Sequence, residues 1–247
     1  MPEPGAAAGR HLDLDGCFNA RDLGGLRTVD GRRVRRGAVV RADAPDRLTA
    51  DGWAALEAHG VRTVIDLRND DERGPDLTAR PACVTTVHRP LDGAEDREFW
   101  GRWAAGPQFG TPLYYAPHLE RCPERSAAVL AAIAEARPGG VLVHCGGGRD
   151  RAGQITMLLL ALVGVARDEI ADDYALSAGR LAALYAARGE KDQNPMLDAY
   201  LAEQGTTPRE ALLAALASID VPERLRAGGL ADDHVAALGD RLLEPAA

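Results

Sequence analysis

Residues 141–165 read "VLVHCGGGRDRAGQITMLLLALVGV", and this stretch decides the fold. Its first four residues form a short apolar run that predicts a buried strand ending at His144. From Arg151 onward the composition changes to that of a long, mostly apolar helix. Residues 145–150 must then connect the two, and three consecutive glycines allow this connection conformations that other residues avoid. A strand, a glycine-rich loop and a helix in direct succession indicate an α/β fold.

The same alternation extends along the chain. Further short runs of β type lie at 38–41, 62–67 and 83–87, and helices are expected at 48–60 and from 123 to the Pro-Gly-Gly at 138–140. Beyond residue 151 we expect helices at 151–165, 167–188 with a break near Ser177, 195–204, 208–218 and 231–243. The pattern predicts an α/β domain with a central, mostly parallel sheet of four or five strands, flanking helices and a helical C-terminal half.

We expect a flexible N-terminal tail over residues 1–12 and a single domain over 13–247. Within this domain, residues 91–119 interrupt the alternation of strands and helices. One interpretation is a helical aromatic flap that shields a site from water and contacts an apolar ligand. The other is a hydrophobic cluster that holds a long connection in place. The segment holds six of the chain's eleven aromatic residues: Phe99, Trp100, Trp103, Phe109, Tyr114 and Tyr115.

Composition excludes several classes of protein. A formal net charge of −8 argues against binding to a phosphate backbone, so nucleic acid is not expected as a partner. The start of the chain lacks the basic flank and apolar run of a signal peptide. The longest strongly apolar stretch, 155–166, is far shorter than the roughly 20 residues of a transmembrane helix, so no transmembrane segment is expected. Four cysteines without a CxxC pair favour a reducing cytoplasm, and secretion without a signal peptide stays open.

The loop after residue 144 combines the groups that a thiolate needs to attack phosphate. A cysteine is a strong nucleophile only as thiolate, which positive charge and a helix N-terminus favour, and Cys145 lies beside both. Gly146, Gly147 and Gly148 can aim backbone N–H groups inward as a nest for a phosphate dianion. Arg151 can bind two phosphoryl oxygens at once. We therefore expect phosphate or vanadate as a ligand, with no metal and no cofactor.

A second cysteine followed six residues later by an arginine tests how specific this pattern is. Cys83 and Arg89 have the same spacing in "CVTTVHR". The β-branched residues between them belong to a predicted strand, which cannot close into a nest. Only the copy at Cys145 has a strand, a glycine loop and a helix in order.

These residues carry a family likeness. "HCGGGRDRAG" resembles the His-Cys-five-Arg signature of the cysteine-dependent protein tyrosine phosphatase superfamily. Three further stretches, "NARDLGG" at 19–25, "IDLRNDDE" at 65–72 and "DDYALS" at 172–177, are similar to its bacterial tyrosine phosphatase and phosphoinositide phosphatase branch. The likeness covers most of residues 17–220. It implies hydrolysis of phosphotyrosine, with phosphoinositides and small monoesters as further substrates, through a phosphocysteine intermediate.

The resemblance also implies roles for individual residues. Cys145 corresponds to the nucleophile and Arg151 to the phosphate-binding arginine. In this branch an acidic residue of the loop assists as general acid, which points to Asp150. The alternative for Asp150 is a structural role, as an acid at the helix N-terminus that favours the dipole or pairs with Arg149. Asp92 is the rival acid, because other branches take theirs from a separate loop. The nest glycines and Arg149 are expected to bind substrate.

Two positions of the loop depart from the family pattern. Arg149 replaces the usual lysine and keeps a positive charge at the rim, consistent with a multiply charged substrate, whereas a solvated surface arginine is the alternative. Ala152 stands where the family has a threonine or serine whose hydroxyl helps the sulfur leave. Its absence predicts slow hydrolysis of the phosphocysteine.

Supporting roles are expected for residues near the loop. His144 should orient the loop through hydrogen bonds. Asp66 ends a strand that we expect to run parallel to 141–144, so Asp66 and Arg68 should reach the same sheet edge as Cys145 and brace the loop. In the "NARDLGG" motif, Asn19, Arg21 and Asp22 could approach the active site, but a tight turn held by local hydrogen bonds explains them as well and is the favoured interpretation.

The leading function from the sequence is that of a phosphatase. A catalytically weak or silent phosphate-binding module is the first alternative, because of Ala152. A sulfur-transfer or arsenate-reducing enzyme that uses the same thiolate loop is the second.

Overall fold

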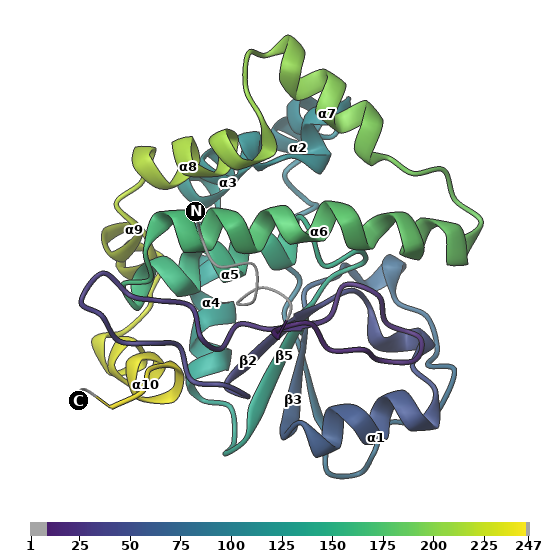
Figure 1. Ribbon diagram of the computed structural model, residues 1–247. Coiled ribbons are helices and arrows are strands. Elements are labelled where there is room, and N and C mark those ends of the chain that lie inside the picture. Colours follow the sequence, from purple (N-terminus) through teal and green to yellow (C-terminus); the bar gives the residue numbers. More distant parts are fainter. Residues whose placement is uncertain (1–8, 246–247) are drawn as a thin grey trace.

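The computed structural model describes residues 9–245 and places a five-stranded sheet at its centre (Figure 1). The strand order is β1-β2-β5-β3-β4, in which β1 is antiparallel to β2 and the other neighbours are parallel. This confirms the predicted mostly parallel sheet. The two-residue edge strand β1 was not predicted, because two residues carry no periodicity. The strands are β1 (Arg21–Asp22), β2 (Val39–Ala42), β3 (Val61–Asp66), β4 (Thr85–His88) and β5 (Gly140–His144).

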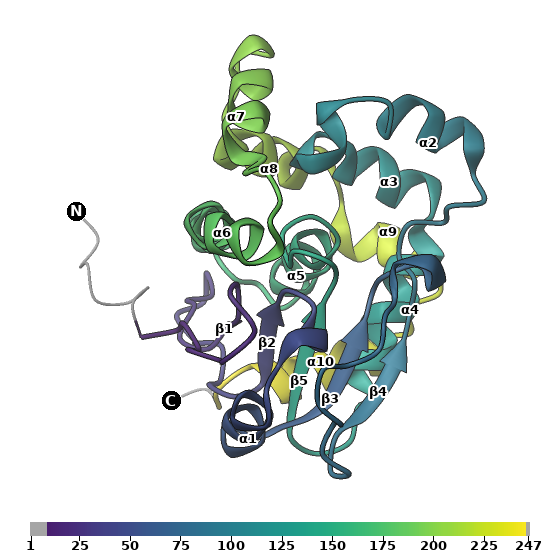
Figure 2. The same cartoon turned by 90° about the vertical axis from the view of Figure 1, so that its right-hand side faces the viewer.

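Helices cover both faces of the sheet. On one face, α1 (Ala50–Ala58) packs Trp53 and Leu56 against strand residues that include Val40 and Leu142. On the other face, α4 (Pro123–Ala134) and α5 (Arg151–Leu162) contact alternate residues of the same strands. Figure 1 shows α1 to the right of the sheet and α4 to its left, and in Figure 2, where the right-hand side of Figure 1 faces the viewer, α4 lies partly behind the strands. Two covered faces explain why all five residues of β5 are buried.

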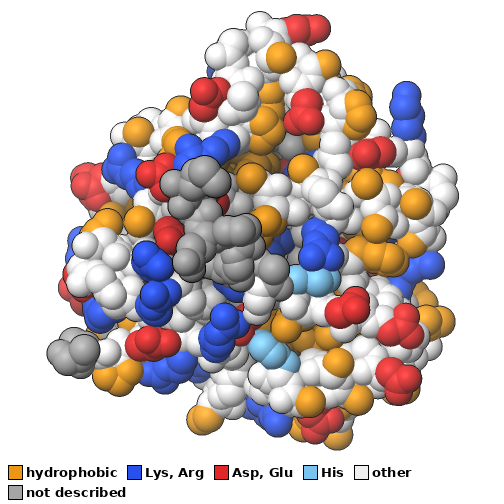
Figure 3. Space-filling view, in the orientation of Figure 1, with side chains coloured by type: hydrophobic (Ala, Val, Ile, Leu, Met, Phe, Trp, Pro, Cys, Tyr) orange, Lys and Arg blue, Asp and Glu red, His pale blue; other side chains and the backbone are white. Residues whose placement is uncertain are grey.

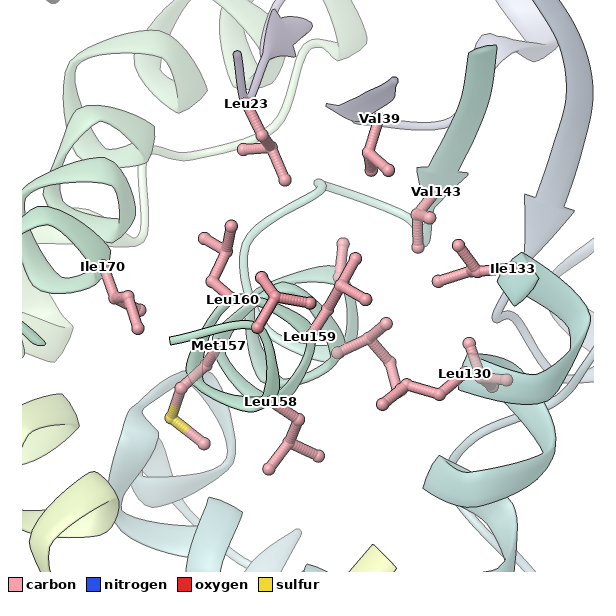
Figure 4. Close-up of a cluster of buried hydrophobic side chains, with 14 of the residues drawn as sticks. Leu23, Val39, Leu130, Ile133, Val143, Met157, Leu158, Leu159, Leu160 and Ile170 are labelled. Carbon is pink, nitrogen blue, oxygen red and sulfur yellow. The ribbon is translucent and has the colours of Figure 1, made fainter. Parts of the chain in front are cut away.

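The helix after the glycine loop lies in the middle of the larger core. Residues 157–160 of α5 read Met-Leu-Leu-Leu, and all four are buried. Figure 4 shows their side chains leaving the helix in different directions, toward α4, α6 and the sheet. Burial on every side explains why this helix is apolar throughout and lacks a polar stripe.

The C-terminal half is helical, as predicted, with two differences. The helix α6 (Arg167–Arg188) is continuous, so the expected break near Ser177 is wrong. The Ser177 hydroxyl is fully buried and hydrogen-bonded by Arg21, and a serine satisfied in this way does not disturb the helix. The short helix α9 (Val221–Ala227) was not predicted. The remaining helices are α7 (Asn194–Glu203), α8 (Pro208–Ser218) and α10 (Asp232–Leu242).

The N-terminal tail predicted over residues 1–12 is too long. Residues 1–8 lie outside the described residues, but residues 9–12 are part of the fold. The Arg10 side chain is buried and forms an ion pair with Asp173 at 2.6 Å, and His11 pairs with Arg21 in an isolated bridge. A buried ion pair ties this segment to α6.

The segment 91–119 is helical and packs its aromatic side chains together. It contains α2 (Arg97–Trp103), α3 (Tyr115–Arg121) and two short 3-10 helices, η3 (Pro107–Gly110) and η4 (Pro112–Tyr114). Trp100 lies within 6 Å of the rings of Phe99, Phe109 and Tyr114, in edge-to-face geometry. Tyr114 and Tyr115 are buried in the main core. These contacts fit the interpretation as a hydrophobic cluster that holds a long connection in place.

The surface is mixed in charge on the face shown in Figure 3, where acidic and basic side chains are interspersed. This face therefore lacks the single-sign patch that a phosphate backbone would require. Within residues 9–245, no helix has both the length and the apolar character that crossing a membrane demands.

Candidate active site

The glycine loop lies at the carboxyl edge of the sheet, in its centre. The strand β5 runs between β2 and β3, parallel to both, and Cys145 follows its last residue. The Cys145 side chain is buried, with 2% of the residue exposed. In parallel sheets the carboxyl ends of the central strands are where ligands bind. The predicted strand, loop and helix therefore place the cysteine where a site is expected.

The loop has the geometry of an anion nest. Gly148 adopts φ +71°, and a Cβ there would lie 2.4 Å from the Ala42 carbonyl oxygen, so only glycine fits. The N–H groups of residues 147–150 donate to no protein acceptor among the described residues. Buried N–H groups without a partner are rare in proteins. Several of them together at the start of α5 have the arrangement that is typical of anion-binding loops.

Groups outside the loop hold both of its ends. The Gly146 carbonyl accepts hydrogen bonds from Ala44 N and Arg188 Nη2, both at 3.1 Å. The Asp150 carbonyl accepts one from the Tyr115 hydroxyl at 2.9 Å. Tyr115, one of the aromatic residues of segment 91–119, thus supports the loop directly.

Arg151 begins α5 and faces two carboxylates. Its guanidinium forms a two-pronged ion pair with Glu72 and donates from Nη1 to Asp92 Oδ2 at 3.1 Å. Burial alone would lower the pKa of Arg151, but Glu72, Cys145 and Asp92 raise it well above its ordinary value. Glu72 is a site residue that we did not predict, although it is the last letter of "IDLRNDDE".

The structure brings Asp92 into the site. Its carboxylate is 6% exposed and accepts a hydrogen bond from Asn69 Nδ2 at 2.9 Å in addition to that from Arg151. Burial raises the pKa of Asp92, and Arg151 opposes the rise. Asp92 is therefore a hydrogen-bond acceptor that holds the Arg151 guanidinium.

Asp150 has a different environment. Its side chain is partly exposed, at 23%, and its one ion-pair partner is Arg149, with Nε 3.3 Å from Oδ1. Arg149 itself is buried and donates from Nη1 to Asn194 Oδ1 at 3.0 Å, which ties the loop to α7. The alternative of a solvated surface arginine at position 149 is wrong. Whether Arg149 also contacts substrate stays a prediction.

His144, Asp66 and Arg68 lie together at the base of the loop, as the predicted parallel pairing required. His144 is opposite Asp66 in the sheet register, with Nε2 3.7 Å from Asp66 Oδ1, and its Nδ1 lies 3.1 Å from the Cys145 carbonyl oxygen. Burial lowers the pKa of His144 to about 4, so the ring is neutral at pH 7. Arg68 makes two hydrogen bonds to Asp66 and also pairs with Asp46.

A pocket of about 390 Å³ adjoins the loop at Arg149. It lies between α6, α7, α8 and the 3-10 helices of segment 91–119, and its lining is mostly apolar. Arg149 is the loop residue that the pocket reaches, whereas Cys145 is not part of its lining. The pocket can hold an apolar group beside a bound anion rather than the anion itself.

The second cysteine and arginine pair is not a site. A strand is present here, but β4 is Thr85–His88 rather than the predicted 83–87, and Cys83 lies in the turn before it. The two members of the pair are thus at opposite ends of an extended segment. Spacing alone does not make a nest.

A buried cysteine before a glycine loop, with an arginine on the first turn of the following helix, is the arrangement typical of cysteine-dependent phosphatases. Residues 12–244 match the model of the tyrosine phosphatase family, so the chain belongs to this family and is a protein tyrosine phosphatase. This confirms the resemblance seen in the four sequence motifs.

Three curated relatives agree with this membership. The chain is 34% identical over 182 residues to a tyrosine-protein phosphatase of Cupriavidus necator, an alignment that covers 70% of this chain and 67% of that protein. It is 35% identical over 177 residues to a tyrosine-protein phosphatase of Nostoc commune, covering 70% and 58% of the two chains. It is 28% identical over 233 residues to the triple specificity protein phosphatase PtpB of Mycobacterium tuberculosis, covering 82% and 81%.

Proposed function

We propose that this phosphatase hydrolyses phosphotyrosine, and also phosphoinositides and other phosphate monoesters, through a phosphocysteine on Cys145. One observation carries the proposal: within residues 9–245, the consecutive N–H groups of residues 147–150 have no protein acceptor, and they lie next to a buried thiol. A phosphoryl group supplies the oxygen acceptors that these donors need.

The first step is an in-line attack. The Cys145 thiolate forms the S–P bond while the bond from phosphorus to the ester oxygen breaks, and the proton of Asp150 goes to that oxygen. The nest and Arg151 stabilise the charge that develops on the phosphoryl oxygens. Asp150 suits the acid role because its carboxyl is partly exposed at the loop, whereas Asp92 is occupied by Arg151 and Asn69.

The second step returns the enzyme to its starting state. Water attacks the phosphorus, its proton goes to the Asp150 carboxylate, and the S–P bond breaks to give inorganic phosphate and the thiolate. The reaction requires a reduced Cys145, which favours the cytoplasm as its location.

The apolar pocket beside Arg149 supports a substrate range wider than small monoesters. A pocket of about 390 Å³ has room for the apolar part of a phosphorylated side chain or lipid. A panel of phosphotyrosine peptides, phosphoserine peptides, phosphoinositides and p-nitrophenyl phosphate, assayed for phosphate release with Cys145→Ser as the blank, tests the proposal. Release from none of these substrates would overturn it.

The general acid can be identified from leaving groups. Replacing Asp150 by asparagine removes the proton donor, so the loss of rate should grow with the pKa of the leaving alcohol. We expect a loss of about 100-fold for phenyl phosphate and a smaller loss for p-nitrophenyl phosphate. The measurement is kcat/KM for a series of aryl phosphates.

Asp92→Asn is the matched control for that series. This variant removes a carboxylate that holds Arg151, so kcat/KM should fall by a similar factor for every leaving group. If the loss of kcat/KM grew with the pKa of the leaving alcohol in Asp92→Asn and not in Asp150→Asn, the acid role would belong to Asp92.

Ala152 should limit the second step. Its side chain is fully buried, and no hydroxyl is present there to assist the departing sulfur. We expect Ala152→Ser to raise the rate of phosphocysteine hydrolysis about tenfold, the value of one hydrogen bond of 1–1.5 kcal/mol. Serine is preferred to threonine, because the extra methyl group in a packed core costs about 1–3 kcal/mol.

Pre-steady-state kinetics with p-nitrophenyl phosphate checks this prediction. The wild type should show a burst of p-nitrophenol followed by slow turnover, and Ala152→Ser should speed the slow phase. Ala132→Ser, in a buried part of α4 away from the loop, is the control. An identical slow phase in the wild type and Ala152→Ser would show that no hydroxyl is needed at position 152.

A further inference from the structure

A buried network of ion pairs contacts the glycine loop, and its residues take no part in the reaction steps proposed above. Its centre is Asp173 of α6, which is 1% exposed and pairs with the guanidinium groups of Arg10, Arg21 and Arg41. We propose that Arg41, aligned by Asp173, is a positioning residue that fixes the outer carbonyl groups of the loop and thereby aims its N–H groups at the phosphoryl group. The inference rests on the proposed function, because it assigns a role in the same reaction.

Arg41 makes direct contact with the loop. It projects from β2, which is the neighbour of β5 in the sheet, and it is 1% exposed. Its Nε donates to the Gly148 carbonyl at 2.8 Å, and its Nη2 donates to the Arg149 carbonyl at 2.9 Å. Its Nη1 faces Asp173 Oδ2 at 3.3 Å. One planar guanidinium thus binds two successive carbonyl groups and a carboxylate, an arrangement that a lysine cannot reproduce.

A second arm runs from the same carboxylate through Arg21. Its Nε donates to Asp173 Oδ1 at 3.1 Å and its Nη1 donates to Asn19 Oδ1 at 2.8 Å. The amide of Asn19 in turn donates to the Gly147 carbonyl at 2.9 Å. The "NARDLGG" motif therefore contacts the loop, which agrees with the alternative that it approaches the site rather than with the favoured interpretation as a purely local turn. Part of that interpretation holds, since Asp22 accepts from Gly24 N at 2.8 Å.

The two arms reach the carbonyl groups of three consecutive residues, 147, 148 and 149. A peptide unit is planar and trans, so its C=O and the N–H of the next residue point in opposite directions. Fixing these three carbonyl groups outward therefore turns the N–H groups of residues 148, 149 and 150 inward. These are members of the set that has no protein acceptor. The network decides the orientation of the donors that would bind phosphate.

Burial makes the network rigid. Asp173 is ionised, because Arg21, Arg41 and Arg10 hold its pKa well below the usual range although burial alone would raise it. Hydrogen bonds between charged groups are strong in a poorly solvated interior. Donors that are already oriented need no rearrangement as charge develops in the transition state, which is where they contribute to rate.

Arg10 provides a matched control within the same network. Like Arg41, it pairs with Asp173, at 2.6 Å, but it makes no hydrogen bond to residues 145–150. A purely structural network predicts that Arg10→Met and Arg41→Met have the same consequences. A positioning role predicts that both variants lose stability and that only Arg41→Met loses activity.

The test compares Arg41→Met, Arg41→Lys and Arg10→Met with the wild type. The experiment measures kcat and KM for p-nitrophenyl phosphate, Kd for inorganic phosphate by titration calorimetry, and the thermal unfolding temperature. For Arg41→Met we expect a loss of about 100-fold in kcat, as for removal of an oriented transition-state donor. Its affinity for phosphate should fall about tenfold, the effect of one or two weakened hydrogen bonds. In Arg41→Lys a single donor nitrogen replaces the planar guanidinium, so its kcat and its affinity for phosphate should lie between those of Arg41→Met and the wild type.

For Arg10→Met we expect kcat within about twofold of the wild type, because it leaves the loop contacts in place. Equal kcat values for Arg41→Met and Arg10→Met would overturn the inference. If Arg41→Met does not fold, Asn19→Ala tests the other arm, and an unchanged kcat in it would be equally damaging. Calorimetry separates the two proposals. A wild type that binds inorganic phosphate but releases no phosphate from any substrate would overturn the proposed function. Weaker phosphate binding by Arg41→Met would still support the positioning role in that case.

Discussion

Replacing Cys145 by serine is expected to abolish turnover and to leave phosphate binding in place. A serine hydroxyl holds its proton far more tightly than a thiol, so it is a much weaker nucleophile at neutral pH and the S–P bond has no counterpart. Loss of a covalent nucleophile typically costs at least about 10⁴-fold in kcat. The N–H groups of residues 147–150 and Arg151 are unchanged, so the variant should still bind inorganic phosphate with nearly wild-type affinity.

Phosphate release and titration calorimetry measure the two halves of this result. Cys83→Ser is the control, because Cys83 has the same spacing to an arginine but lies before an edge strand. It should behave as the wild type. Release by Cys145→Ser at the wild-type rate would exclude a phosphocysteine mechanism.

Replacing Arg151 by lysine should have the second largest effect. Lysine retains the charge but cannot bind two phosphoryl oxygens in one plane, and it cannot keep the paired contacts with Glu72 and Asp92. An arginine that stabilises a transferring phosphoryl group is worth about 10³-fold or more, so kcat should fall by at least that factor.

The affinity for phosphate should fall as well, since Arg151 also binds the ground state. Steady-state kinetics with p-nitrophenyl phosphate and calorimetry with inorganic phosphate give the two values. Arg89→Lys, at the second pair, is the matched control and should change neither. A lysine variant with more than a tenth of the wild-type kcat would mean that charge alone suffices at position 151.

Local signals predicted the centre of the fold. The strand before Cys145, the glycines after it and the apolar helix from Arg151 all depend on residues that are neighbours in the chain. Their pairing with the strand that ends at Asp66 followed from the rules of parallel sheets. For this reason the nest and its arginine could be located before any tertiary contact was known.

Two features of the fold were missed for physical reasons. The strand β1 is defined by its partner β2, because two residues have no period of their own. The expected break in α6 came from the ordinary preference of serine for helix ends, which does not apply when Ser177 is buried and bound by Arg21.

The supporting residues of the site depend on contacts between distant segments. Glu72 reaches Arg151 across 79 positions, Asn19 reaches Gly147 across 128, and Arg41 reaches Gly148 across 107. No periodicity or spacing in one sequence encodes such pairs, since they form only when the sheet is assembled.

The amino-acid sequence by itself determined the reactive group and the local shape that holds an anion next to it, because a glycine loop between a strand and a helix is a local structure. Only the tertiary structure decided which carboxylates face Arg151 and which donors hold the loop from behind. The carboxylates come from the segments that follow β3 and β4, and the donors come from β2, from α6 and from the turn at Asn19. Their distances are set by packing rather than by position along the chain. The reactive groups of the site can thus be identified in one stretch of sequence, whereas the orientation of these groups depends on the whole fold.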